Sequence, residues 1–306
     1  KMQTTQSQDT ILKGIGLAVL ACLIWSGNFI IARGVVKNIP PVTLSFYRWL
    51  TAAIFILPLA WKYVKDDITI AIKNPWIILL ASVTGVSLFN TFIYIAGHYT
   101  TAINLAILGT CTSPVISVLL ARIFLNEKIT SLRLLGMLVC IAGILFLLGK
   151  GDFENLKSFR FTKGDWWVLA AAFAFAVYNI SVRKKDKAMK PTGFLFITFL
   201  LGTLILLPFY IIKWQHQGGF EFNLQNISAI LFLGLGASVI CFLIWNKSIH
   251  ILGAGRTALF GNLIPIFSSI EAVLFLNEKI TSVHIISFIL VIAGLIIANF
   301  KSEKRV

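Results

Sequence analysis

Polar side chains set inside long apolar runs are the residues of this chain that could do chemistry. They offer indole, amide, phenol and guanidinium groups, which together hold a small amphipathic molecule by stacking and hydrogen bonding. Asn90 and Tyr94 are four residues apart and therefore share one helical face. The alternative for each residue is a contact between packed helices, since amide and hydroxyl groups also join helices in a membrane. The candidates for a substrate-binding site are Trp25, Asn28, Arg48, Asn90, Tyr94, Tyr178, Asn179, Trp245 and Asn262.

Two charged side chains, Arg48 and Glu271, also lie inside apolar runs. A rise of about 1.5 Å per residue places both of them roughly 7–9 Å below the same edge of the bilayer. Arg48 is expected to hold a substrate carboxylate, and Glu271 is expected to exchange a proton, which makes protons a candidate coupling partner. The alternative is a static ion pair, or two side chains whose charged ends reach the lipid headgroups.

The remaining motifs argue against an enzyme. Residues 253–258 match G-x-G-x-x-A, but a dinucleotide site needs a preceding strand, and apolar helical runs lie on both sides of this segment. The four histidines are scattered without metal-ligand spacing, so no metal site is expected. The four cysteines all sit in apolar runs and are expected to be small buried residues rather than disulfides. We therefore expect no catalytic residues, no metal and no cofactor.

Composition identifies the elements that must position these side chains. The chain has 306 residues, of which 58% are hydrophobic and only 13% are charged. A soluble domain is usually about 45–50% apolar and about 25% charged. The net charge of +15 is explained by basic loops at lipid headgroups, so nucleic acid is not expected as a partner. The composition predicts an all-α membrane protein whose partner is the lipid bilayer.

Ten transmembrane helices fit the chain, because one span needs about 20 apolar residues. Prolines at Pro41, Pro75 and Pro191 mark places where a new helix begins. Lys and Arg collect at the end of the bundle that holds both termini, so the N- and C-termini are expected to be cytoplasmic. The predicted spans are 13–36, 42–62, 75–97, 101–124, 132–149, 164–183, 192–213, 227–250, 255–276 and 282–300.

The chain matches itself at an offset of 151 residues. The octapeptide F-L-N-E-K-I-T-S occurs at 124–131 and again, without change, at 275–282. The same offset pairs Asn28 with Asn179 and Gly85 with Gly236. Each copy contains five spans, and because five is odd the second copy enters the membrane from the opposite side. We therefore predict two inverted five-helix repeats. Glu127 and Glu278, at the helix ends within the octapeptides, are expected to be structural.

Inverted repeats around one site have two related packings, one open to each side of the membrane. Rocking between them gives alternating access, with the substrate bound at the repeat interface. We therefore expect a secondary transporter of a small metabolite. The alternatives are a carrier of lipophilic cations, a lipid scramblase, and a duplication kept only for packing.

Several segments resemble the EamA-type transporters of the drug/metabolite transporter superfamily. Residues 25–29 (W-S-G-N-F) resemble the W-G-x-x-F signature of the first helix, and residues 45–53 resemble the arginine segment of the second. Pro114 and Pro265 are each followed by glutamate and then glycine, which is similar to the pattern of the fourth and fifth helices. The resemblance covers nearly the whole chain.

This resemblance implies a ten-helix carrier of a bacterial inner membrane, often an exporter of amino acids or other metabolites. It implies a cavity lined by helices 1, 3, 4, 6, 8 and 9, which carry most of the candidate residues. The first repeat is expected at 1–149, a linker at 150–163 and the second repeat at 164–306.

Overall fold

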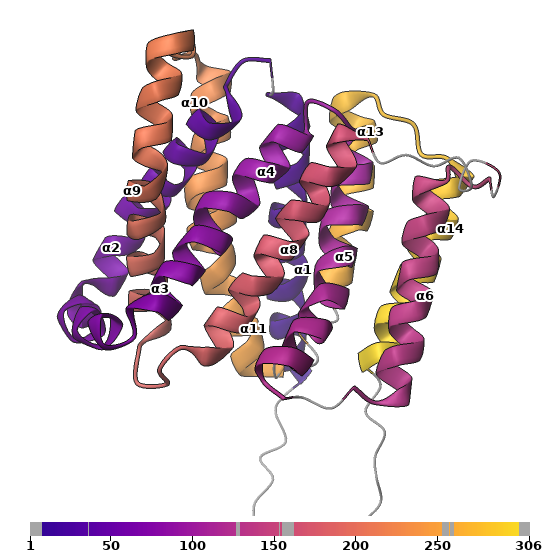
Figure 1. Ribbon diagram of the computed structural model, residues 1–306, viewed down its shortest axis with the longest axis horizontal. Helices are drawn as coiled ribbons and strands as arrows, with labels where there is room; N and C mark the ends of the chain where they lie inside the picture. Colours follow the sequence, from indigo (N-terminus) through magenta and orange to yellow (C-terminus); the bar gives the residue numbers. More distant parts are fainter. Residues whose placement is uncertain are drawn as a thin grey trace, which may run out of the picture.

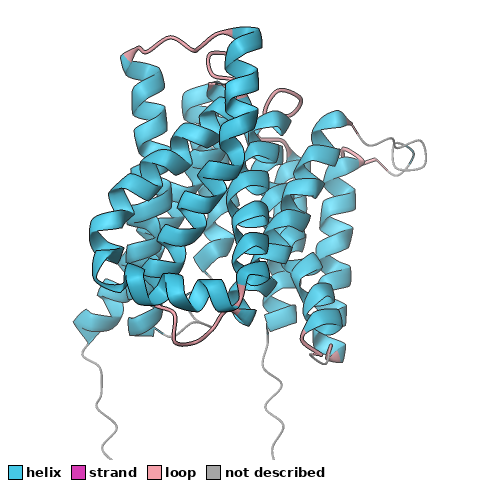
Figure 2. Cartoon of the chain, turned by 60° about the vertical axis from the view of Figure 1, so that its left-hand side comes forward, coloured by secondary structure: helices cyan, strands magenta, loops and turns pink. Residues whose placement is uncertain are grey.

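The computed structural model describes residues 8–35, 37–126, 129–152, 154, 162–252, 257 and 260–299. These residues form ten helical segments that run up and down as one bundle (Figures 1 and 2). Three of the segments consist of consecutive elements: α3, η1 and α4; α10, η2 and α11; and η3 and α13. The first repeat comprises α1 (Gln8–Gly34), α2 (Pro41–Lys73), α3 (Pro75–Ala81), η1 (Ser82–Leu88), α4 (Phe89–Ala96), α5 (Ala102–Phe124) and α6 (Ser131–Leu148). The second comprises α8 (Lys163–Lys184), α9 (Pro191–Gln217), α10 (Leu224–Leu231), η2 (Phe232–Ile240), α11 (Cys241–Leu252), η3 (Gly261–Leu263), α13 (Ile264–Leu276) and α14 (Ser282–Asn299).

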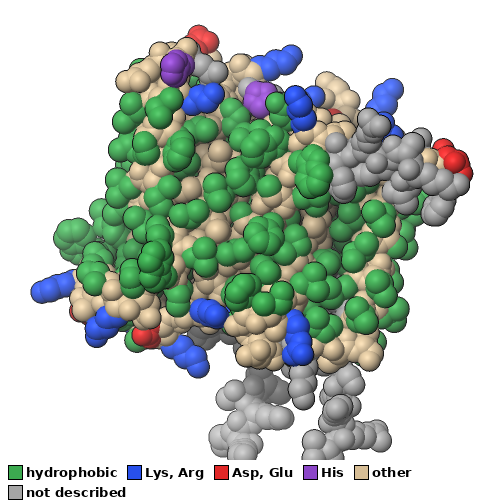
Figure 3. Space-filling model, viewed as in Figure 1, with side chains coloured by type: hydrophobic (Ala, Val, Ile, Leu, Met, Phe, Trp, Pro, Cys, Tyr) green, Lys and Arg blue, Asp and Glu red, His purple; other side chains and the backbone are tan. Residues whose placement is uncertain are grey.

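This is an integral membrane protein. Within the described ranges, seven helices are long and apolar enough to cross a bilayer, and three shorter apolar helices accompany them. Hydrophobic side chains cover the middle of the bundle, while Lys and Arg gather at its two ends (Figure 3). α1 begins and α14 ends at the same end of the bundle. We call that end the terminal face and the other end the opposite face.

Local sequence explains where most helices begin. α2, α3 and α9 each start with proline, whose fixed φ suits the first helical turn and whose missing N–H needs no partner there. Thr101 accepts a hydrogen bond from the Asn104 amide at the start of α5. Thr162 and Asp165 form a reciprocal capping box at the start of α8. These five helices start within one residue of their predicted positions, whereas α1 begins at Gln8, five residues before the predicted start at residue 13.

The end of α2 differs from the prediction, since the helix continues to Lys73 rather than stopping at residue 62. The extension is amphipathic: Lys62 and Lys65 are exposed, while Asp67 is buried. Charges end an apolar span without ending a helix, which is why hydropathy placed the boundary too early. Asp67 Oδ1 accepts a hydrogen bond of 3.0 Å from the Lys190 amide, so the extension caps the start of α9 in the other repeat.

The third span of each repeat contains a π-helical stretch, η1 or η2, at equivalent positions 151 residues apart. In each stretch one serine hydroxyl donates to the carbonyl five residues earlier. Ser87 Oγ lies 3.3 Å from the Ser82 oxygen, and Ser238 Oγ lies 2.9 Å from the Leu233 oxygen. π-Helical turns are uncommon and occur mostly at functional sites. The two repeats therefore share a π-helical stretch in their third span as well as a sequence pattern.

α6 and α14 pack closely against each other at the edge of the bundle (Figure 1). Cys140 Sγ donates to the carbonyl of Val291, its own equivalent at the 151-residue offset, across 3.4 Å. A residue that touches its equivalent lies on the two-fold axis. Glycine permits the crossing, because a Cβ on Gly294 would lie 2.6 Å from the Cys140 nitrogen and 2.6 Å from the Gly136 oxygen.

Candidate functional site

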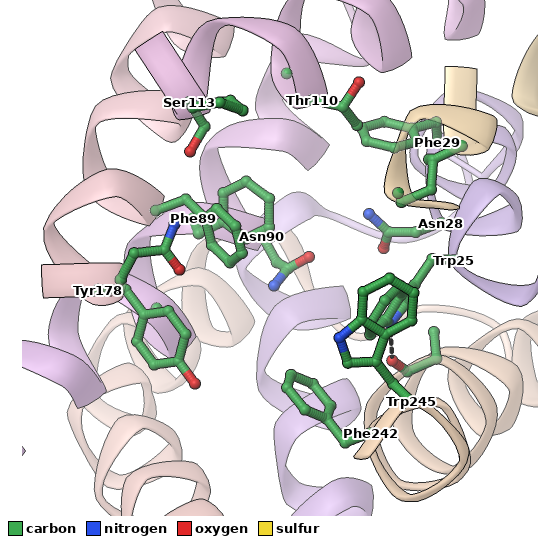
Figure 4. Close-up of a pocket in the computed structure, with 18 of the residues that line it drawn as sticks. Trp25, Asn28, Phe29, Phe89, Asn90, Thr110, Ser113, Tyr178, Phe242 and Trp245 are labelled. Carbon is green, nitrogen blue, oxygen red and sulfur yellow. Dashed lines mark hydrogen bonds between the residues drawn. The ribbon is translucent and has the colours of Figure 1, made fainter. Parts of the chain in front are cut away.

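A cavity of about 500 Å³ lies between the two repeats. Its wall is built from α1, α2, η1, α4 and α5 of the first repeat and from helices of the second, chiefly α8, η2, α11, η3 and α13. Figure 4 shows side chains from both repeats converging on this space. Seven residues that the sequence singles out line it: Trp25, Asn28, Arg48, Asn90, Tyr178, Asn179 and Trp245.

The two further candidates are Tyr94 and Asn262. Tyr94 is fully buried beside the cavity and reaches it through hydrogen bonds to Arg48 and Asn28. Asn262 belongs to η3, next to the cavity-lining Gly261, but its side chain lies outside what the structure describes.

Arg48 is the centre of a buried hydrogen-bond network that joins both repeats. Its Nη1 donates to Asn28 Oδ1, to Asn90 Oδ1 at 3.0 Å and to the Tyr94 hydroxyl at 2.7 Å. Its Nε donates to Ser238 Oγ of η2 at 3.1 Å. Sequence reasoning identified Asn28, Asn90 and Tyr94 as candidates but missed Ser238. The π-helical stretch offers no local sequence signal that would place this hydroxyl against a residue 190 positions earlier.

The charged side chain of Arg48 is surrounded by neutral groups. The side chain is only 4% exposed, and its guanidinium carbon lies 4.9 Å from the centre of the Trp49 ring. Its equal depth in the membrane made Glu271 a possible partner of Arg48. Glu271 instead accepts a hydrogen bond of 2.8 Å from Ser26 Oγ. Among the described residues, no carboxylate is hydrogen-bonded to Arg48. The wall of the cavity therefore carries a net positive charge at this point.

One side of the cavity is an aromatic cluster from α1 and α11. The Trp25 ring lies 5.1 Å from that of Trp245 and 5.8 Å from that of Phe242, measured between centroids. Trp25 Nε1 also donates to the Ala237 carbonyl of η2 across 2.8 Å, which fixes the indole (Figure 4). Because its one donor is already satisfied, the indole offers mainly its faces to a ligand.

The other side is formed by aromatic rings of α4 and α8. Phe89 stacks on Phe175 at 4.6 Å, and Phe175 lies 5.7 Å from Tyr178. Gly85 of η1 makes room for the Tyr178 ring, since a Cβ on this glycine would lie 2.2 Å from the ring. Close to these rings, Asn179 Nδ2 donates to Ser117 Oγ across 3.4 Å. The cavity is thus apolar on two sides and polar between them.

The cavity extends toward the terminal face. Its lining residues on α8 and α13 reach Val182 and Ile264, which lie at the ends of these helices nearer that face. On the side of the opposite face, Ile93 and Ile103 are buried in the core. The bundle is therefore closed between the cavity and the opposite face.

Glu278 reinforces this closure with a contact between repeats. Its Oε1 accepts from the Ala102 amide at 2.8 Å and its Oε2 from the Ile103 amide at 3.1 Å. The carboxylate therefore caps the start of α5, a helix of the other repeat, and an anion is favoured at that end of a helix. The structural role expected for Glu278 is present, but the capped helix lies 175 residues away in sequence. Glu127 lies outside the described residues.

A second contact holds the turn between α4 and α5. Arg33 Nη1 donates to the Gly97 carbonyl at the end of α4 across 2.8 Å, where a cation is favoured. Burial, and next the neighbouring Arg33 guanidinium, lower the pKa of His98 in this turn below its usual 6.5. Because its pKa is lowered, His98 is neutral at pH 7 and adds no charge to the opposite face.

The described residues contain no group of three or more His, Cys, Asp or Glu side chains that could hold a metal ion. The four cysteines are free and buried. The groups around the cavity are one guanidinium, amides, hydroxyls and aromatic faces, which suit the binding of a small molecule.

Comparison with known proteins gives matches over both repeats. The model of the EamA-like transporter family matches residues 12–149 and again residues 162–300. An uncharacterized transporter of Archaeoglobus fulgidus is 29% identical over 94% of this chain and 98% of its own length. A probable amino-acid metabolite efflux pump of Escherichia coli is 22% identical over 94% of this chain and 95% of its own length.

A solved crystal structure shares the fold. It superimposes with a TM-score of 0.64 at 18% sequence identity, covering 96% of this chain and 97% of the other. At that identity the likeness concerns the fold alone.

Proposed function

The chain belongs to the EamA-like transporter family, and on that premise we propose that it exports or exchanges a small metabolite, first an amino acid, by alternating access. The observation that carries the proposal is the cavity between the two repeats, which is lined by residues of both and is closed toward the opposite face. Inverted repeats provide two equivalent packings around such a site. A cavity of about 500 Å³ is within the size range of sites for small organic molecules.

The relatives support an amino acid as the first substrate to test. Those of Escherichia coli and Salmonella typhimurium are named probable amino-acid metabolite efflux pumps, at 22% and 24% identity. The polar strip beside Arg48 suits the charged backbone of an amino acid, and the aromatic sides suit an apolar side chain.

The orientation follows from the basic residues. The end of α8 and the loop that follows it carry Lys184, Lys185, Lys187 and Lys190. We therefore place the terminal face in the cytoplasm of a bacterial cell, with the protein in the inner membrane. Single cysteines at two exposed loop positions test this. A cysteine replacing Glu221 should react with an impermeant thiol reagent applied to intact cells, and one replacing Lys187 should not. The reverse result contradicts the orientation.

Transport is tested with purified protein in liposomes. Labelled amino acids are loaded inside, and their saturable release is compared with release from protein-free liposomes. Trp245→Ala, in the cavity, should reduce release, whereas Trp214→Ala, at a partly exposed residue near the end of α9, should leave it unchanged. Flip-flop of fluorescent lipids without metabolite release would support a scramblase and contradict the proposal. Release of lipophilic cations alone would support the alternative carrier.

Glu271 is our candidate for proton coupling. It lies at the contact of α1 with α13, where Oε1 is bonded to Ser26 and Oε2 is buried without a hydrogen-bond partner among the described residues. Glu271→Gln keeps an oxygen that accepts from Ser26 but removes the exchangeable proton. A proton gradient should accelerate transport by the wild-type protein and not by this variant. An equal response of both proteins removes Glu271 from the coupling mechanism.

A further inference from the structure

We infer that the cavity selects substrates with one carboxylate group and an apolar or aromatic body, and that the carboxylate is the counter-ion of Arg48. The inference rests on the proposed transport function and names the class of substrate for the same cavity. Three features carry it: the donors that Arg48 leaves unused, the charge of the wall, and the distribution of apolar and polar surface.

The first feature is the inventory of guanidinium donors. Arginine has five N–H groups in a planar fork: one on Nε and two on each terminal nitrogen. Nε and Nη1 of Arg48 donate to side chains of both repeats. Among the described residues, none accepts a hydrogen bond from Nη2. Because Nε and Nη1 are held by protein groups and the residue lines the cavity, Nη2 is a positioned, charged donor that is left for the carboxylate of a ligand.

The second feature is the charge. Arginine stays protonated in proteins, so Arg48 brings a permanent positive charge into the bundle. A buried charge surrounded only by neutral oxygens is costly, and a ligand carboxylate lowers that cost by pairing with it. Glu271, the half-buried acid of α13, accepts from Ser26 and not from Arg48. On α2 itself the first acid after Arg48 is Asp66, about 27 Å away at the helical rise. A cationic ligand meets repulsion instead, which opposes the lipophilic-cation alternative.

The third feature is the shape of the remaining wall. The Trp25 cluster and the Phe89 cluster present aromatic faces on two sides. Between them lie a few polar groups, among them Ser113, whose buried hydroxyl has no hydrogen-bond partner among the described residues. An apolar or aromatic body stacks between the rings while the carboxylate reaches Arg48, and an amino group finds oxygen acceptors beside it.

The test compares four compounds with the same aromatic body: phenylalanine, phenylalaninamide, phenethylamine and 3-phenylpropionate. Thermal unfolding of the detergent-solubilised protein is followed with each compound, because a ligand of the folded state raises the unfolding temperature. Competition for amino-acid release from liposomes is measured in parallel. The two carboxylates should stabilise and compete, and the amide and the amine should be weaker by about tenfold or more.

Two variants of α2 sharpen the comparison. Arg48→Gln should reduce the preference for carboxylate over amide to about threefold or less, while Lys62→Gln, at an exposed position of the same helix, should leave it unchanged. If Arg48→Gln does not fold, the compound series on the wild-type protein still decides. Equal potency of phenylalanine and its amide on a protein that transports overturns the inference and leaves the proposed function standing. Failure of the wild-type protein to release any metabolite overturns the proposed function and the inference with it.

Discussion

Removing the Glu278 carboxylate should loosen the closure at the opposite face. In Glu278→Ala the Ala102 and Ile103 amides lose their acceptors at the start of α5. Losing a helix cap costs about 1 kcal/mol, and losing a negative charge at a helix N-terminus costs about a further 0.3–1 kcal/mol. Because the carboxylate comes from the other repeat, this loss of about 1–2 kcal/mol falls on the contact between the repeats. It corresponds to roughly a 5- to 30-fold rise in the population open at this face.

Cys111 is a native reporter of that opening. It lies on α5, lines the cavity and is only 2% exposed. In a protein whose other three cysteines are replaced by alanine, an impermeant thiol reagent applied at the opposite face reaches Cys111 only when the closure opens. The labelling rate should therefore rise roughly 5- to 30-fold in Glu278→Ala.

Thr101→Ala is the matched control, since Thr101 caps the same end of α5 from within its own repeat. Its loss weakens the start of the helix to a similar extent, about 1 kcal/mol, but leaves the contact between the repeats in place. Labelling should change little in this variant. Equal labelling in both variants, or no increase in Glu278→Ala, would refute the assignment of Glu278 to the closure.

Three further predictions concern packing and capping. Gly294→Ala should lower the free energy of unfolding by about 1–3 kcal/mol, because its Cβ meets the backbone of α6, whereas Gly16→Ala, with nothing within 4 Å of its Cβ, should be neutral or stabilising in denaturant titrations. Asp67→Ala should lower the free energy of unfolding by about 1 kcal/mol through loss of the cap on α9, measured in the same way; an unchanged value contradicts the cap. Gly85→Ala should push the Tyr178 ring and alter the apparent affinity for substrate more than it alters protein stability, as liposome assays and unfolding curves can show.

Helices and their order were predictable from the sequence because hydropathy and proline act locally. The starts at Pro41, Pro75 and Pro191 agree with the predicted spans for that reason. The extension of α2 to Lys73 was not predicted, because a hydropathy boundary marks the end of the apolar run and not the end of the helix. The π-helical stretches were also not predicted, since one extra residue per turn leaves no clear mark in the apolar pattern.

The composition of the site was partly predictable, but its pairings were not. A buried polar group in a membrane helix is costly unless it is satisfied, so Asn28, Arg48 and Asn90 stood out as residues that need partners. Which groups satisfy them depends on contacts between the repeats, such as Ser238 with Arg48, and these leave no signal in the local sequence. The same holds for Glu278, whose octapeptide repeat indicated a role without indicating the helix that it caps.

The contact of Cys140 with its equivalent Val291 has a consequence for measuring motion. A point on a two-fold axis is its own image, so exchanging the conformations of the two repeats leaves that contact where it was. Other distances between the repeats are free to lengthen on one face while they shorten on the other. The contact of α6 with α14 is therefore a fixed reference point for measuring motion. The distance between a spectroscopic label on α6 and one on α14 at this contact should stay constant throughout the proposed cycle.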